Sequence, residues 1–145
     1  MNIEYHKWWS PSLGQEMELK VYGYYGKPVV VFPAQAGRFY EYEDFKMIEA
    51  IAWYIETGRI KVFTLDSIDA QSWANWELHP AQRAQRHEDY DRYVVQEVAP
   101  FIHEHTHNRE QKFISTGCSM GGYHAANFFF RHPDVFDAMI CLSGL

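Results

Sequence analysis

The segment that decides the fold is residues 113–122, which read Phe113-Ile114-Ser115-Thr116-Gly117-Cys118-Ser119-Met120-Gly121-Gly122. Its first half is typical of a buried strand, and the residues from Met120 onward favour a helix. A serine with a glycine two positions away on each side fits a tight strand-to-helix turn, because glycines tolerate the close backbone approach. Such a turn presents the hydroxyl at a helix N-terminus, where a developing negative charge is favoured. We therefore predict Ser119 as a nucleophile and Gly117 and Gly121 as the glycines of its elbow.

Around this turn the chain alternates between strand and helix patterns. The N-terminal segments alternate polar and apolar residues, which predicts an antiparallel hairpin, whereas the β-branched run at 28–33 predicts a strand covered on both faces. We expect strands at 3–9, 16–22, 28–33, 60–65, 112–116 and 135–142. We expect helices at 42–54, 80–105 (kinked or divided at Pro100) and 120–131. This order predicts one α/β domain over residues 1–145, with a mostly parallel sheet flanked by helices.

Composition excludes several classes of protein. The 145 residues are 47% hydrophobic and 17% aromatic, which is enough for a core and unlike a disordered chain. A net charge of -6 without a basic stripe argues against a nucleic-acid partner. No apolar run approaches the ~20 residues of a membrane span, and the N-terminus lacks a signal-peptide core, so we expect no membrane association. Cys118 and Cys141 are expected to be reduced and buried, which favours a cytoplasmic protein.

An oxyanion hole needs two backbone N–H groups aimed at one point. The first is expected from Met120, directly after the serine, and the second from the loop after the third strand. We place the second donor at Gln35, with Ala34 or Ala36 as alternatives; an ordinary strand-to-helix connection is the competing interpretation.

Other side chains were weighed as site residues. Arg38, Tyr40 and Trp73 fall near the same edge of the sheet and are candidates for lining a substrate pocket, although aromatic residues are more often core. The repeat His103-x-His105-x-His107 suggests metal, but residues two apart on a helix do not share a face, so we expect a solvated helix end and no metal site. A run of charged residues on the long helix predicts a solvated face: Arg83, Arg86, His87, Asp89, Asp91 and Arg92.

Residues 117–127, the segment 131–134 and the strand at 138–144 together resemble the Putative esterase family. This is the α/β-hydrolase branch related to esterase D and to the mycobacterial antigen 85 acyltransferases. Residues 32–45 and 66–73 are similar to it as well, so the resemblance extends from about Lys20 to the end of the chain. It implies an α/β-hydrolase-like fold and hydrolysis of a small-molecule carboxylic ester through an acyl-enzyme, by a Ser-His-Asp/Glu triad without metal or organic cofactor.

The resemblance also implies a triad acid and histidine that follow the serine along the chain. Only 26 residues follow Ser119, and one helix and one strand occupy them. We therefore expect a chain truncated after the sixth strand, which lacks the C-terminal strands and helices together with both triad partners. His124, which is expected to be a packed helix histidine, and His132 are badly placed to act as the base, and Asp134 and Asp137 fall at the wrong end of the last strand to act as the acid. The geometry of His79 and His87 is open, but their spacing does not favour them as the base.

Two alternatives to an esterase follow from that expectation. One is a noncatalytic binding or interaction module, or an inactive fragment, on the hydrolase scaffold. The other is an acyltransferase, which differs only in the acceptor of the acyl group. The apolar strand at 135–142 is expected to be an exposed sheet edge, so we predict a homo-oligomer or pairing with a complementary fragment there.

Overall fold

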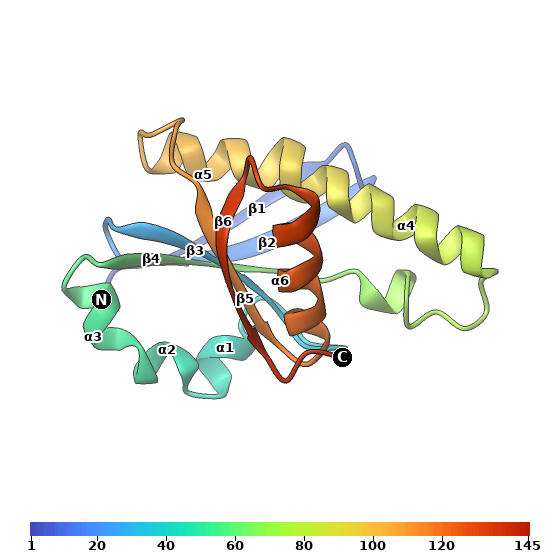
Figure 1. Cartoon of the computed structure of the whole chain (residues 1–145), viewed down its shortest axis with the longest axis horizontal. Coiled ribbons are helices and arrows are strands. Elements are labelled where there is room, and N and C mark those ends of the chain that lie inside the picture. Colours follow the sequence, from blue (N-terminus) through green and yellow to red (C-terminus); the bar gives the residue numbers. More distant parts are fainter.

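A six-stranded sheet organises the computed structural model, which describes all residues from 1 to 145. The strands lie in the spatial order β1-β2-β4-β3-β5-β6 (Figure 1). The β1/β2 and β2/β4 pairs are antiparallel, and β4, β3, β5 and β6 run parallel to one another. The predicted α/β class with an antiparallel N-terminal hairpin is confirmed. The strand bounds are β1 Ile3–Ser10, β2 Gln15–Tyr22, β3 Lys27–Phe32, β4 Ile60–Leu65, β5 Phe113–Cys118 and β6 Phe136–Leu142.

Helices cover both faces of the sheet (Figure 1). One face packs against the long C-terminal helices through a core that includes Phe32, Tyr93 and Phe128. The other face packs against the short helices through Tyr22, Ile48 and their neighbours. Burial on both faces explains why the central strands are continuously apolar. The helix bounds are α1 Glu41–Asp44, α2 Met47–Ala50, α3 Ala52–Glu56, α4 Pro80–Tyr93, α5 Ala99–His105 and α6 Met120–Arg131, with a 3-10 turn at Asp69–Gln71.

One helix prediction needs correction. The single helix expected at 42–54 is three short helices, and Lys46 between the first two has φ 65°, a left-handed conformation that a continuous helix cannot contain. The helix expected at 80–105 is divided close to Pro100, as predicted. A π-helical segment, Val94–Val98, separates α4 from α5, and Pro100 lies in the first turn of α5, where its missing N–H is tolerated.

Two further features concern the surface. Strand β6 pairs with β5 alone and forms one edge of the sheet, and Ile140 on it is 52% exposed. Cys141 on the same strand is exposed and Cys118 is only partly buried, contrary to the expectation that both cysteines are buried. Both cysteines are free. None of the helices has the length and apolar character needed to cross a membrane.

Candidate active site

Ser119 occupies the turn between β5 and α6 in a strained conformation, with φ 56° and ψ -119°. Its N–H donates to the carbonyl of Leu142 on the neighbouring strand (2.9 Å), and its own carbonyl accepts from the Tyr123 N–H (3.1 Å). These bonds hold the backbone at a positive φ that a residue with a Cβ rarely adopts. The serine is therefore the first residue before the helix, as the sequence predicts for a nucleophile elbow.

The two elbow glycines are required by space. A Cβ on Gly117 would lie 2.5 Å from the backbone of Gly121 and from the carbonyl oxygen of Phe32. A Cβ on Gly121 would overlap that same Phe32 oxygen and approach the Pro33 oxygen. The start of α6 therefore packs directly on the end of β3, which brings the loop after β3 beside the elbow.

Backbone N–H groups near the elbow differ in whether they are already hydrogen-bonded. The N–H groups of Gln35 and Ala36 have no hydrogen-bond partner in the structure. Met120 is the first residue of α6, where a backbone N–H has no partner within its own helix. The Ala34 N–H, by contrast, donates to Glu41 Oε2 at 2.9 Å, and Glu41 thus anchors the loop after β3.

An apolar hollow of about 250 Å³ lies next to the elbow, lined by Trp73, Met120, Tyr123 and Leu145. Trp73, predicted as a pocket residue, is therefore placed beside the start of α6. Arg38 and Tyr40 do not line this hollow.

Arg38 is instead held in an ion-pair network. Its Nε donates to both carboxylate oxygens of Asp66 (2.9 and 3.1 Å), and its Nη2 donates to Glu18 (3.0 Å). Hydrogen bonding to Asp66 raises the pKa of Arg38. The ring of Tyr40 lies 5.8 Å from the guanidinium. Arg38 therefore links the loop after β3 to the loop after β4.

Behind the elbow is a group of four side chains that we call the buried cluster: Asp69, Trp73, His87 and His124. The Nε2 of His124, on α6, lies 2.8 Å from Asp69 Oδ1, and both side chains are only 3% exposed. The His87 ring stacks on His124 at 5.6 Å and lies 5.2 Å from Trp73. Burial, and to a smaller extent the neighbouring His124, lower the pKa of His87 to about 4. His124 is thus a packed histidine, as expected, whereas His87 was wrongly assigned to a solvated face.

Three further histidines are engaged away from the elbow, and no side chain hydrogen-bonds to Ser119 Oγ. His79 caps α4, His103 bonds to the Gln111 carbonyl, and His132 pairs with Asp91. Asp91 is buried, so the charged run on α4 is only partly solvated, in contrast to the prediction. The partners of His124 and His132 lie 55 and 41 residues away in the sequence, and no local spacing could have identified them.

Comparisons with solved structures identify the same fold in several proteins. S-formylglutathione hydrolase from Staphylococcus aureus superposes with a TM-score of 0.74 at 20% identity, covering 99% of this chain and 59% of that one. The fluorophosphonate-binding serine hydrolase F of the same organism gives 0.73 at 19%, covering 99% and 57%. Mycobacterium tuberculosis MPT51 gives 0.66 at 20%, covering 94% and 48%. The chain therefore spans between about half and three fifths of the length of these structures.

Sequence comparisons place the chain in a family. A search of curated proteins gives no match. The family described as Putative esterase matches residues 10–145, which is nearly the whole chain. This chain therefore belongs to the Putative esterase family.

Proposed function

We propose that Ser119 is the nucleophile of a carboxylic-ester hydrolase that works through an acyl-enzyme. The observation that carries the proposal is the strained Ser119 backbone at the start of α6, next to the N–H groups of Met120 and Gln35. A strained serine persists only where the surrounding structure enforces it, and such strain gathers at functional sites. Family membership and the serine-hydrolase neighbours support the same reaction class.

The proposed reaction uses these groups in order. Ser119 Oγ attacks the acyl carbonyl of an ester seated beside Trp73, and its proton passes to a general base. The N–H groups of Met120 and Gln35 stabilise the oxyanion of the tetrahedral intermediate. The alcohol leaves with a proton returned by the base, and water then releases the acyl group from the serine.

The general base is proposed to come from polypeptide outside these 145 residues. A serine hydroxyl is a weak nucleophile without an adjacent base, and no histidine described here contacts Ser119 Oγ. Without that base the oxyanion hole alone supports only a small residual rate. The chain by itself is therefore expected to turn over esters feebly.

Strand β6 is the proposed place of association. It is an unpaired edge, and a hollow of about 290 Å³ beside it is lined almost wholly by apolar side chains, including Ile114, Ile140 and Leu142. An apolar edge with free N–H and C=O groups favours pairing with another strand, from a second copy or a complementary fragment. A cytoplasmic location belongs to the same proposal, supported by the free cysteines Cys118 and Cys141.

A fluorophosphonate probe together with a chromogenic short-chain ester tests the nucleophile. We expect labelling of the chain extended by its downstream reading frame, and loss of both labelling and turnover in Ser119→Ala. Phe130→Ala, which removes an exposed side chain near the far end of the same helix, is the matched control and should keep both. An extended chain that folds but neither labels nor turns over ester would overturn the enzyme proposal in favour of a noncatalytic module. A monomer at high concentration by light scattering, with no fragment bound, would overturn the β6 association.

A further inference from the structure

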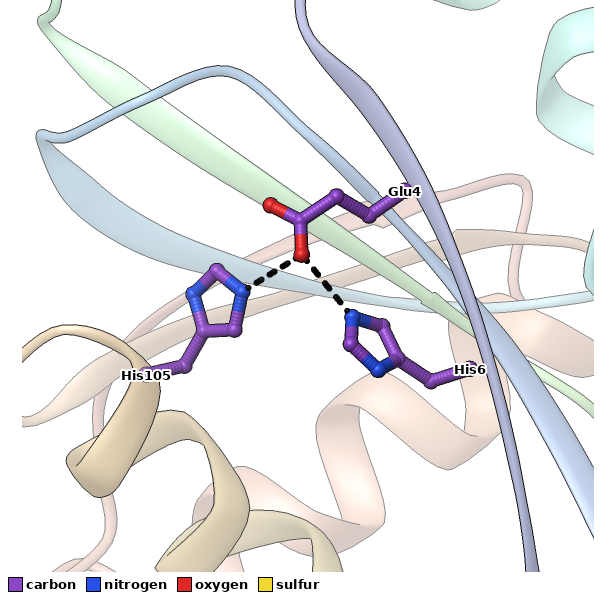
Figure 2. A group of neighbouring side chains, drawn as sticks. All are labelled: Glu4, His6 and His105. Atoms are coloured by element: carbon purple, nitrogen blue, oxygen red, sulfur yellow. Dashed lines mark hydrogen bonds and ion pairs between the residues drawn. The ribbon is translucent and has the colours of Figure 1, made fainter.

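We propose that Glu4, His6 and His105 form a binding site for a divalent first-row transition metal, with zinc as its representative. We call these three residues the open cluster. Strand β1 contributes Glu4 and His6, and the end of α5 contributes His105. Figure 2 shows one carboxylate oxygen of Glu4 between the two imidazole rings.

The donor atoms already stand close to metal-ligand spacing. Glu4 Oε1 lies 3.0 Å from His6 Nε2 and 3.1 Å from His105 Nε2, and the three donor atoms all lie within 4.8 Å of one another. Zinc bonds of about 2.0–2.1 Å in a tetrahedral site place neighbouring ligand atoms about 3.3 Å apart. Small side-chain shifts therefore suffice to admit a metal ion in place of the hydrogen-bonding protons.

Neighbouring side chains hold these ligands in place. The ring of Phe101 contacts His6 (4.9 Å between centroids) and His105 (5.5 Å), and Phe63 packs edge-on against His105 (5.8 Å). Asn2 Nδ2 donates to the second oxygen of Glu4 at 3.1 Å, which orients the carboxylate. Fixed ligand orientation raises metal affinity, because less side-chain freedom is lost on binding.

The site is reachable from solvent. The three side chains are between 17% and 34% exposed, and a hollow of about 510 Å³ between the β2–β3 turn and the end of α5 includes His105. The buried amine of Lys61 donates to the Tyr24 carbonyl at 3.0 Å. This amine lies close enough to Glu4 to interact with its charge, and its own positive charge disfavours a further cation nearby. We therefore expect moderate affinity, with a water completing the coordination.

Two histidine imidazoles and one carboxylate are the donor set of several protein zinc sites that keep one position for water. Here the ion would tie the N-terminal strand to α5 across the edge of the sheet. This differs from the sequence-based expectation of no metal. It also differs from the His103-x-His105-x-His107 repeat, because His103 bonds to Gln111 and only His105 reaches the cluster.

Titration of the metal-free chain with zinc chloride, followed by calorimetry and thermal melting, tests the site. We expect one ion per chain and, at a hundredfold excess over Kd, a rise in Tm of about 5–10 °C. His6→Gln, His105→Gln and Glu4→Gln should each weaken binding at least tenfold. Glu4→Gln keeps the shape and hydrogen-bonding capacity of the side chain, so circular dichroism should show an unchanged fold.

His107→Asn is the matched control, since it removes a histidine from the same helix end at a residue with φ 53°, a conformation that asparagine tolerates. It should leave zinc affinity within twofold, and cobalt added in place of zinc should give the absorption bands of a nitrogen- and oxygen-bound ion. Absence of saturable binding by the folded chain would overturn the proposal. So would binding that survives all three cluster variants or is lost in His107→Asn.

Discussion

The buried cluster and the open cluster each bring two histidines together with one carboxylate, and they differ in burial. In the first, Asp69 and His124 are 3% exposed, and His124 packs against aromatic rings. In the second, Glu4, His6 and His105 are 17–34% exposed, and His105 lines an open hollow. Burial makes a histidine–carboxylate pair a fixed part of the scaffold, because an unpartnered polar group in the interior is costly. Partial exposure leaves the imidazoles and the carboxylate of the open cluster free to give up their hydrogen-bonding protons and bind an ion.

The buried cluster also has a structural role that follows from its position beside the elbow. The buried cluster includes His124 on α6, the helix that begins at the elbow, so its packing supports the backbone of Ser119. Four of its polar atoms are buried without a partner: Asp69 Oδ2, Trp73 Nε1, His87 Nδ1 and His124 Nδ1. We therefore expect few substitutions to be tolerated in the buried cluster.

The largest expected difference between the clusters is in folding stability. Asp69→Ala removes the partner of a buried histidine and should lower the free energy of unfolding by about 3–5 kcal/mol. Asp69→Asn, which can still bond to His124, should lose clearly less. Urea unfolding followed by fluorescence measures both. A loss below about 1 kcal/mol for Asp69→Ala would mean that the buried cluster is no more structural than a surface pair.

Acid should act mainly on the buried cluster. Burial lowers the pKa of His87 from 6.5 to about 4, so the unfolded chain takes up this proton before the folded chain does. The contribution to stability is thus complete above pH 6.5 and falls by about 3 kcal/mol as the pH drops to 4. Urea unfolding at several pH values measures it.

His87→Phe serves as the control for this acid effect, because it keeps an aromatic ring against Trp73 and His124 while removing the titrating group. Its stability should decline less steeply between pH 6.5 and 4. Carboxylates with a lowered pKa, such as Glu88 beside Arg131, affect the stability of the wild type and of His87→Phe alike, and they do so at lower pH. Parallel pH profiles for wild type and variant would assign the acid sensitivity to other groups.

The backbone strain at the elbow should change the free energy of unfolding by less than the buried cluster does. Ser119→Gly should raise the free energy of unfolding by about 1 kcal/mol, because glycine adopts φ 56° without strain, while abolishing fluorophosphonate labelling. Ser119→Ala retains a Cβ and the strain, so it should abolish labelling without the gain. Equal stability of the two variants would show that the turn holds no usable strain.

Local patterns were sufficient for the strands and the turn at Ser119. The run from Phe113 to Gly122 encodes a strand, a turn and a helix in ten consecutive residues, and the structure has each where the pattern predicts it. The helix predicted at 42–54 was wrong because its apolar spacing is preserved across the breaks. Phe45 and the left-handed Lys46 separate the first two short helices, and lysine carries no signal for that conformation.

Neither cluster could be predicted from local sequence patterns, because its members are distant along the chain. Asp69 and His124 are 55 residues apart, and Glu4 and His105 are 101 apart. Which of the many charged residues meet is decided by the strand order of the sheet and by the course of α4 and α5. No local pattern at the end of α5 indicates that His105 lies beside Glu4 on β1.

The smallest expected effect concerns the open cluster without metal. Burial raises the pKa of Glu4, but hydrogen bonds from His105 and His6 outweigh it and leave the pKa below its ordinary value. Glu4→Gln should therefore lower the free energy of unfolding at pH 7 by only about 0.5 kcal/mol in the presence of a chelator, because half-exposed pairs are screened by water. Urea unfolding with chelator and then with zinc measures this, and the gap between wild type and variant should widen several-fold with zinc. A loss above about 2 kcal/mol with chelator would show that the cluster stabilises the fold by itself, as Asp69 and His124 do.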